Sequence, residues 1–155
     1  MTAQPTATRA NVAALVPCYF EEKRIREVAT ATKAELDLVL AVDDGSTDRT
    51  SDEARAAGVE VIKHEKNAGK GAAIKTGLRA LLDRPGVEFI LILDGDGQHL
   101  PAEIPNFLAE ANATGAAKVS TIYGDEVSKI HPVRDTLRFF KLLKRLKREA
   151  AQAAT

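Results

Sequence analysis

The chain has 155 residues, of which 45% are hydrophobic and 28% are charged, a composition that suits one soluble domain with a real apolar core. It has 22 basic and 22 acidic residues, but seven of the basic and only two of the acidic ones lie between residues 134 and 149, which leaves the rest with a net charge of about −5. The single cysteine, Cys18, excludes an internal disulfide.

No apolar run approaches the roughly 18 residues of a membrane-spanning helix. The N-terminal segment MTAQPTATRAN also lacks the apolar core of a signal peptide. We therefore expect a soluble, cytoplasmic domain. Residues 1–10 are rich in Thr, Ala and Pro and are predicted to form a disordered leader.

Strand-like and helix-like segments alternate along the chain after this leader. Helical spacing predicts three helices, and the second should have Ser46 or Thr47 as its N-cap and Gly58 just past its end. Alternation of this kind favours an α/β fold, with a mostly parallel sheet and helices on both faces. The predicted strands lie at residues 12–16, 36–42, 59–62 and 89–93, and the predicted helices at 21–35, 47–57 and 70–82.

Three further elements are predicted beyond residue 100. Pro101 suits the first turn of a helix that runs to about residue 113, and the run at 118–123 is a candidate fifth strand. Residues 131–155 read as a basic amphipathic helix. Such a helix can lie on an anionic membrane surface, and packing on the sheet or burial in a homodimer are the alternatives. Its apolar stripe consists of Phe139, Leu142, Leu143 and Leu146.

Acidic and polar residues follow three of the predicted strands at the point where each strand ends. In open parallel sheets, ligands bind beyond the carboxyl ends of the strands. We therefore expect these three clusters to meet at one edge of the sheet. They read PCYFEE (17–22), DDGSTD (43–48) and DGDGQH (94–99).

Asp94 and Asp96 present the clearest chemical question. Residues two apart in an extended backbone project to the same side, and two carboxylates about 4 Å apart repel by roughly 4 kcal/mol at an effective dielectric of 20. Either one carboxylate takes up a proton or a divalent cation neutralises the pair, with Gln98 as a neutral oxygen ligand. A solvated acidic turn after a strand is the alternative.

The other two clusters each have a structural and a functional interpretation. Asp43 and Asp44 fit a turn that caps the next helix, but Asp44 is also well placed to accept hydrogen bonds from a nucleobase. Tyr19 could stack on a ring, and Glu21 could accept from a hydroxyl group. The alternative for these two residues is a plain turn before a charged helix start.

The glycine-rich segment NAGKGAAIKTG (67–77) fails the phosphate-loop pattern, because His64 stands where its first glycine should be. A glycine-rich loop that opens a helix can still bind an anion, here with Lys70 beside it, or it can serve only as a tight helix entry. The three histidines are too scattered for a metal-ligand set, and only His99 neighbours the acidic pair. Cys18 is predicted to be packed rather than reactive.

These residues resemble a known family. PCYFEE is similar to the PxYNEE opening of family-two glycosyltransferases, which have the GT-A fold, and the later motifs follow in the expected order over roughly residues 12–113. The set is most similar to the polyprenyl-phosphate (dolichol-phosphate) mannose or glucose synthases. The metal motif of those enzymes, DxDxQH, corresponds to Asp94, Asp96, Gln98 and His99. The segment TIYGDEVSKIHPVRD (121–135) resembles the end of their catalytic domains, where Lys129 would be the lysine that contacts the donor diphosphate.

The resemblance implies a nucleotide-sugar-binding domain at residues 11–130, whose Rossmann-like half carries the donor site. The implied reaction is inverting transfer of a hexose from a GDP- or UDP-sugar to a polyprenyl phosphate, at the inner membrane face, with no nucleic acid partner. Asp96 and Lys129 would be catalytic, and Mg²⁺ or Mn²⁺ would be held by Asp94, Asp96 and Gln98. The implied donor-binding residues are Pro17, Tyr19, Glu21, Val42, Asp44, Lys70, Asp94, Gly95, Asp96 and Lys129.

Two departures from the family pattern stand out. Phe20 replaces the usual asparagine, a change expected to be mild. Ala117 passes almost directly to Thr121, where family members carry an acceptor-side segment, so the chain resembles an internally shortened member. A nucleotide-sugar-binding module without turnover is therefore one alternative. A phosphotransfer protein with Asp94 as phosphoryl acceptor, either a haloacid-dehalogenase-type phosphatase or a response regulator, is another.

Overall fold

The computed structural model describes residues 6–97, 101–114 and 119–121. The chain divides into two units, residues 1–124 and 125–155, and the second lies wholly outside the described residues. The first contains one five-stranded parallel sheet in the order β3-β2-β1-β4-β5. The strands are β1 (Val12–Cys18), β2 (Leu38–Asp43), β3 (Glu60–Lys63), β4 (Phe89–Ile92) and β5 (Val119–Thr121). The helices are α1 (Ile25–Glu35), α2 (Thr50–Ala56), α3 (Lys70–Leu82), η1 (Pro101–Glu103, a 3₁₀ turn) and α4 (Ile104–Thr114).

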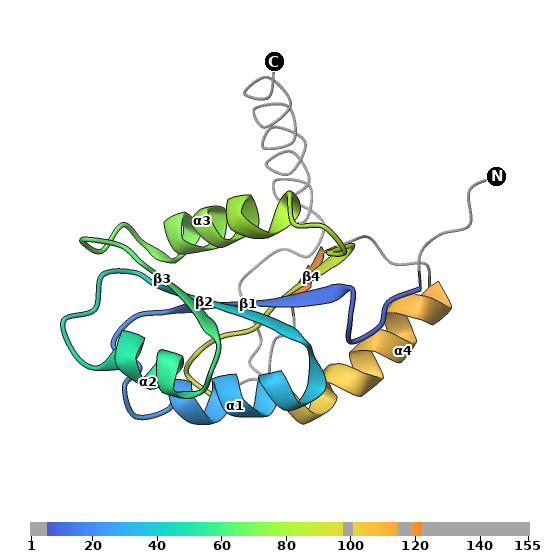
Figure 1. Ribbon diagram of the computed structural model, residues 1–155, viewed down its shortest axis with the longest axis horizontal. Helices are drawn as coiled ribbons and strands as arrows, with labels where there is room; N and C mark the ends of the chain where they lie inside the picture. The colour runs from blue at the N-terminus through green and yellow to red at the C-terminus, as the bar shows by residue number, and fades with distance from the viewer. Residues whose placement is uncertain (1–5, 98–100, 115–118, 122–155) are drawn as a thin grey trace, which may run out of the picture. The chain divides into compact units, whose positions relative to one another are not determined.

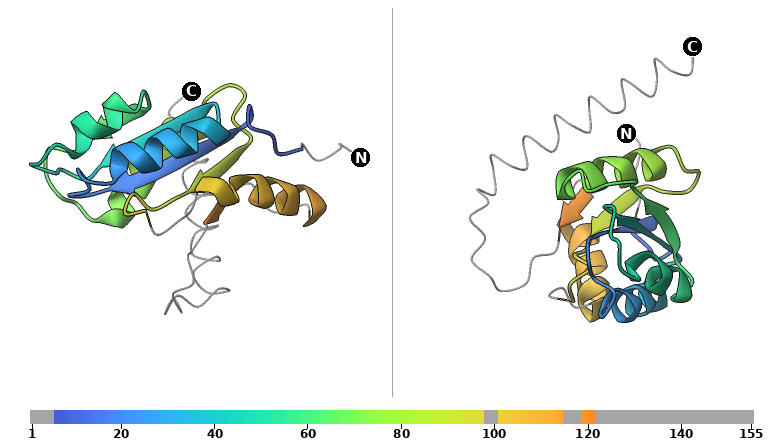
Figure 2. Two further views of the ribbon diagram at one scale, coloured as in Figure 1. Left: turned by 90° about the horizontal axis from the view of Figure 1, so that it is seen from below. Right: turned by 90° about the vertical axis from the view of Figure 1, so that its left-hand side faces the viewer.

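Helices cover the sheet on both sides, as Figures 1 and 2 show: α3 lies on one face, and α1, α2 and α4 lie on the other. Every residue of β1 and β4 is buried, which explains why these strands are continuous apolar runs in the sequence. The edge strand β3 is only partly buried, with both of its end residues exposed. The predicted α/β fold with a mostly parallel sheet is therefore confirmed.

The order of the strands determines where a ligand site can form. From β1 the chain moves outward through β2 to β3, then returns to β4 on the other side of β1 and continues to β5. The direction of winding therefore reverses between β1 and β4, whose residues pair from Val12 with Phe89 to Leu15 with Ile92. In open α/β sheets, a crevice forms beyond the carboxyl ends of the strands at such a switch point.

Residues 6–10, which were expected to belong to a disordered leader, have a defined structure. Ala7 is buried, and its backbone N–H donates to Oδ1 of Asn112 in α4 at 2.6 Å. The backbone N–H of Asn11 donates to the carbonyl of Thr8 at 3.2 Å, which closes a turn before β1. Hydrogen bonds tie this segment to the fold, between Ala7 and Asn112 in α4 and between Arg9 and Asp37. Local composition cannot reveal these contacts.

The cap of α2 also differs from the prediction. The Thr50 N–H donates to Oδ1 of Asp48 at 3.0 Å, whereas Ser46 hydrogen-bonds to Asp43 and does not cap the helix. Gly58 follows the helix with φ +73°, as expected, and its N–H donates to the carbonyl of Arg55 at 2.8 Å.

No helix among the described residues is long and apolar enough to cross a membrane.

Three predictions fall outside the described residues: the helix at 131–155, the boundary between residues 130 and 131, and the shortening after Ala117.

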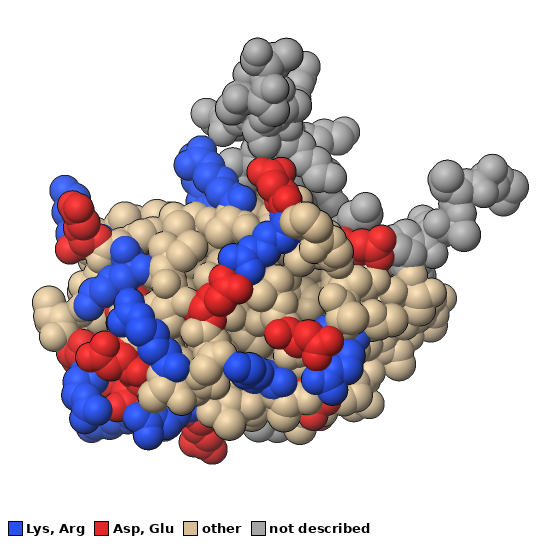
Figure 3. All heavy atoms as spheres, viewed as in Figure 1, with Lys and Arg blue, Asp and Glu red and all other residues tan. Residues whose placement is uncertain are grey.

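The distribution of charged side chains on the described part of the chain is visible in Figure 3. On the face drawn there, acidic and basic side chains of the described residues are interspersed. The excess of acidic residues does not form a single-sign patch on that face.

Gly77 lets α3 pack closely on β1, and this contact gives a test of the fold. A Cβ at Gly77 would overlap Cδ1 of Leu15 and lie 2.9 Å from Cδ2, and the Leu15 side chain is completely buried. Gly77→Ala should therefore lower the free energy of unfolding by about 1–3 kcal/mol, measured by urea denaturation. The control Gly71→Ala lies in the same helix with no atom within 4 Å of its Cβ position and should cause no loss. Equal stability of the two variants would contradict the packing.

Candidate functional site

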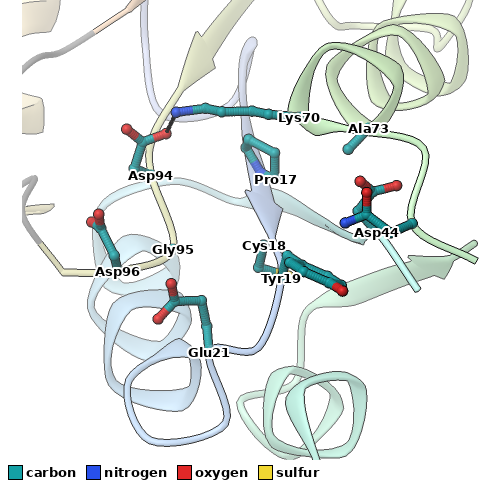
Figure 4. A pocket seen from close by; sticks show the side chains of 11 residues that line it. Pro17, Cys18, Tyr19, Glu21, Asp44, Lys70, Ala73, Asp94, Gly95 and Asp96 are labelled. Atoms are coloured by element: carbon teal, nitrogen blue, oxygen red, sulfur yellow. Dashed lines mark ion pairs between the residues drawn. The ribbon is translucent and has the colours of Figure 1, made fainter. Parts of the chain in front are cut away.

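An open pocket of about 280 Å³ lies beyond the carboxyl ends of β1 and β4, at the switch point of the sheet. This volume is near the lower end of the range for ligand pockets, roughly 300–1,000 Å³. Figure 4 shows Asp94, Asp96 and Glu21 along one side and Asp44 on the other. The lining residues are Pro17, Cys18, Tyr19, Glu21, Asp44, Asn67, Lys70, Ala73, Asp94, Gly95 and Asp96.

Negative charge gathers on the β4 side of the pocket. The Lys70 ammonium, from the first residue of α3, lies 2.5 Å from Oδ1 of Asp94. The Arg24 guanidinium donates to the backbone carbonyl of Asp96 at 2.9 Å. Burial raises the pKa of Glu21, and the charge of Asp96 raises it further, while Arg24 partly opposes the shift. A cation close to these carboxylates would relieve their mutual repulsion.

The end of β1 carries two exposed aromatic side chains. Tyr19 lines the pocket, and its ring centroid lies 4.4 Å from that of Phe20. Phe20 has φ +55°, in the left-handed region that asparagine tolerates better than phenylalanine. Its backbone N–H donates to Oγ of Ser46 at 2.9 Å, which helps to hold this conformation. Phenylalanine therefore bears more backbone strain at this position than asparagine would.

The two neighbouring aspartates at the end of β2 have different roles. Asp43 is completely buried and accepts from the backbone N–H of Ser46 at 2.9 Å and from the hydroxyl groups of Ser46 and Ser51. The Nζ atom of Lys63 lies 3.9 Å from Oδ2 of Asp43. Asp43 therefore stabilises the turn after β2, so the structural interpretation of the DDGSTD motif holds for the turn but not for the helix cap.

Asp44 instead faces the glycine-rich segment that opens α3. Its carboxylate accepts from the N–H groups of Ala68 at 3.0 Å and Gly69 at 2.6 Å, and lies 2.7 Å from Nδ1 of His64. Burial alone would raise its pKa, but the hydrogen bonds from Ala68, His64 and Gly69 outweigh burial and hold the pKa below its ordinary value. Asp44 is ionised near neutral pH, with three protein donors around it.

The buried thiol of Cys18 borders the pocket but is not reactive. Burial, followed by the charge of Asp43, raises the pKa of Cys18 to about 12. Its Sγ lies 3.6 Å from the carbonyl oxygen of Val42. A thiol with such a pKa is not a nucleophile near neutral pH, which confirms the prediction that Cys18 is packed.

Most of the predicted site residues come together in this pocket, but not all of them. Val42 does not line it, because its side chain is completely buried within β2, paired with Pro17 of β1. Gln98 and Lys129 lie outside the described residues. The predicted residues that line the pocket are Pro17, Tyr19, Glu21, Asp44, Lys70, Asp94, Gly95 and Asp96.

Sequence reasoning missed Asn67 and Ala73 in the pocket and His64 behind it. His64 directly follows β3, so the rule that directed attention to the ends of the other strands would also have indicated this residue. Asn67 lies in the glycine-rich segment and Ala73 lies in the first turn of α3. Both side chains are uncharged, so no sequence pattern indicated that they line a ligand site.

The residues of the pocket suit a hard divalent cation whose remaining ligands are oxygens of a bound anion. Among the described residues, no group of three His, Cys, Asp or Glu side chains is placed to hold a metal ion unaided. Mg²⁺ usually takes one or two carboxylates and completes its shell with phosphate oxygens and water. Asp94 and Asp96 fit this requirement.

The fold and the site define an α/β domain with an open pocket at the switch point of a parallel sheet. The sequence profile of the family described as "Glycosyl transferase family 2" matches residues 13–153, which is most of the chain. The chain therefore belongs to glycosyl transferase family 2, and the resemblance noted in its motifs is confirmed.

Two relatives show how much of a longer protein this chain resembles. It is 39% identical over 113 residues to an uncharacterized protein of Methanocaldococcus jannaschii, MJ0544, covering 68% of this chain and 49% of that protein. It is 33% identical over 124 residues to the undecaprenyl-phosphate 4-deoxy-4-formamido-L-arabinose transferase of Shewanella sediminis, covering 72% of this chain and 36% of that enzyme. The chain thus spans half or less of the length of these relatives.

A solved structure supports the fold. Glucosyl-3-phosphoglycerate synthase from Mycobacterium tuberculosis, crystallised with Mn²⁺, UDP-glucose and phosphoglyceric acid, matches with a TM-score of 0.52 and 24% identity. The match covers 62% of this chain and 37% of that one. At this identity the likeness establishes the GT-A-like fold alone.

The hydrogen bonds to Asp44 predict a pH-dependent contribution to stability. Asp44→Asn should lower the free energy of unfolding at pH 7 by about 1.5–3 kcal/mol, because two backbone donors and His64 lose a charged acceptor. The folded-state pKa lies below the ordinary 3.8, so this stabilisation is present above that value and is lost as the pH falls through the folded-state pKa. Urea unfolding from pH 7 to pH 3 should show a difference between the two proteins that narrows below about pH 4.

The control for this comparison is Asp52→Asn, whose side chain is 72% exposed. It should change stability little at any pH in this range. A difference between wild type and Asp44→Asn that stayed constant down to pH 3 would contradict the assignment.

Proposed function

We propose that this domain binds a nucleoside diphosphate sugar, GDP- or UDP-linked, together with Mg²⁺ or Mn²⁺, and transfers the hexose with inversion to a polyprenyl phosphate. The observation that carries the proposal is the pocket at the ends of β1 and β4, lined by Glu21, Asp94, Asp96 and Lys70. Membership of glycosyl transferase family 2 supports the reaction class. The undecaprenyl phosphate in the name of the Shewanella sediminis relative supports the acceptor class.

The nucleoside would lie toward Tyr19, Asn67 and Asp44. Tyr19 is 43% exposed and borders the pocket, so its ring would contact a base or ribose bound there. Asp44 already accepts from three protein donors, and a carboxylate has about four lone-pair sites. At most one acceptor site therefore remains on Asp44 for an N–H or O–H group of the ligand.

The diphosphate would lie toward Asp94, Asp96 and Lys70. A divalent cation bound there neutralises charge on the leaving diphosphate. Asp94 and Asp96 would hold the cation, with Gln98 as a further oxygen ligand. Lys70 would donate to a phosphate oxygen, since its ammonium already lies in the pocket beside Asp94. The proposed role of Lys129, a second positive charge beside the diphosphate, rests on the sequence resemblance alone.

The acceptor explains why the site needs no strong general base. A phosphate monoester is largely ionised near pH 7, so its oxygen can attack the anomeric carbon as the bond from that carbon to the diphosphate breaks. The chain would act in the cytoplasm at the inner membrane face, with residues 131–155 as the proposed membrane contact or as part of a homodimer interface.

One observation favours a second candidate, a nucleotide-sugar-binding module without turnover. The chain spans only 36–49% of the two relatives described above, and the sequence resemblance points to a missing acceptor-side segment. The phosphotransfer alternatives are disfavoured by the family match.

A transfer assay separates the two candidates. The chain is incubated with Mg²⁺ or Mn²⁺, a panel of UDP- and GDP-hexoses and undecaprenyl phosphate, and the products are identified by mass spectrometry. A hexosyl phospholipid and free nucleoside diphosphate are expected for the enzyme. Nucleotide binding without transfer or donor hydrolysis would leave only the binding module, and no binding of any donor would contradict both.

Asp96→Ala should abolish metal-dependent nucleotide binding while leaving the fold intact, because a carboxylate proposed to hold the cation is lost. Calorimetric titration with UDP and GDP, in Mn²⁺ and again in EDTA, measures the effect. Wild type should bind in Mn²⁺ and lose most of its affinity in EDTA, whereas the mutant should be weak in both. The control Asp52→Ala removes an exposed acid from α2 and should bind like wild type. Unchanged affinity in Asp96→Ala would refute the metal assignment.

A further inference from the structure

The segment His64–Gly69, called here the β3–α3 loop, connects the end of β3 to the start of α3. It lies directly against the turn that follows β2. A Cβ at Gly45, where φ is +81°, would overlap the carbonyl carbon of Lys66 and lie 2.6 Å from the backbone nitrogen of Asn67. Backbone therefore packs on backbone here, and the position of the loop depends on this contact.

Hydrogen bonds hold the same loop from two sides, the turn after β2 and helix α3. Asp44, just past β2, accepts from the loop N–H groups of Ala68 and Gly69. His64 places Nδ1 2.7 Å from Oδ1 of Asp44 and Nε2 2.9 Å from Oγ1 of Thr76 in α3. Since the carboxylate can only accept, Nδ1 of His64 carries a proton and donates.

His64 is thus the link between Asp44 and α3. Its side chain is 18% exposed and that of Asp44 is 3% exposed, so water competes little for these hydrogen bonds. His64 itself is not among the residues that line the pocket. Any effect that it has on a ligand must therefore act through Asp44 and the loop.

The loop carries part of the pocket wall. Asn67 and, one residue beyond the loop, Lys70 both line the pocket, and Lys70 reaches Asp94 on the far side. A small displacement of the loop would move both side chains relative to the carboxylates. Binding depends on such placement because donors and acceptors weaken steeply outside hydrogen-bonding distance and angle.

We propose that His64 is a positioning residue for the nucleoside diphosphate: its hydrogen bond to Asp44, with a smaller contribution from its contact with Thr76, fixes the β3–α3 loop, and with it Asn67 and Lys70, in the binding position. This inference rests on the proposed function, because it assumes that the pocket binds a nucleoside diphosphate.

Two substitutions of His64 separate its two hydrogen bonds. His64→Asn places an amide near the position of Nδ1 and can still donate to Asp44. His64→Gln places its amide near the position of Nε2, so it keeps the partner Thr76 and loses Asp44. Affinity for UDP or GDP in Mn²⁺ is measured by calorimetry, for whichever nucleotide the wild type binds. Hydrogen exchange of the Ala68 and Gly69 amides, which donate to Asp44, is measured in parallel.

His64→Gln should weaken nucleotide binding by roughly tenfold and speed exchange of these two amides, because a hydrogen bond to a charged group is lost. His64→Asn should stay within about threefold of wild type, since it keeps that bond. A purely structural role would not predict rescue by asparagine at a temperature where circular dichroism shows all variants folded. Unchanged affinity in His64→Gln, or equal losses in the two variants, would overturn the proposal.

Thr76→Val gives an independent test and replaces His64→Gln if that variant does not fold. It removes the hydroxyl group that contacts Nε2 of His64 and changes no residue of the loop or of the pocket lining. It should reproduce the small loss of His64→Asn. Added to His64→Asn it should change nothing further, because the Thr76 hydroxyl has already lost its partner. Additive losses would contradict the linkage through His64.

Failure of the proposed function is recognised separately. If the wild type binds neither nucleotide in Mn²⁺, the proposed function fails and so does this role for His64. If the wild type binds and the variants bind equally well, only the positioning role of His64 is refuted.

Discussion

The convergence of carboxylates at the carboxyl ends of adjacent parallel strands is the constraint on which the rest of this site depends. Parallel pairing brings the ends of β1, β2 and β4 to one edge of the sheet, and each of these strands is followed by acidic residues. The repulsion that results must be offset within the fold or by a ligand. Lys70 lies beside Asp94, and Arg24 binds the backbone at Asp96. The pKa of Glu21 is raised, first by burial and then by the charge of Asp96.

The negative charge of the carboxylates is stabilised differently on the two sides of the pocket. Around Asp44, backbone N–H groups and His64 stabilise the charge, so its pKa is lowered. Near Asp94 and Asp96, the fold supplies the flexible, positively charged side chain of Lys70. The two carboxylates there also offer oxygen atoms that suit a hard cation. This difference between the two sides is consistent with the proposed ligand, a nucleoside diphosphate whose base would lie toward Asp44 and whose diphosphate would lie toward Asp94 and Asp96.

The same comparison clarifies the DDGSTD motif. Its three acids do three different tasks: Asp43 ties together the turn after β2, Asp44 holds the β3–α3 loop, and Asp48 binds the first N–H of α2. Phe20 adopts a left-handed conformation beside this turn, held by Ser46. The structural interpretation of the motif therefore holds for the turn at Asp43, and the nucleobase contact expected of Asp44 stays a prediction.

The sequence by itself determined the strands, the helices, the parallel sheet and the edge at which the acidic clusters meet. It could do so because apolar periodicity and turn residues are local signals, and because parallel strands place their ends together whatever lies between them. The tertiary structure alone decided that Val42 is turned into the core, that His64 links Asp44 to Thr76, and that residues 6–10 pack beside α4. These facts depend on register and on contacts between residues far apart in the chain, and no local pattern of side chains specifies them.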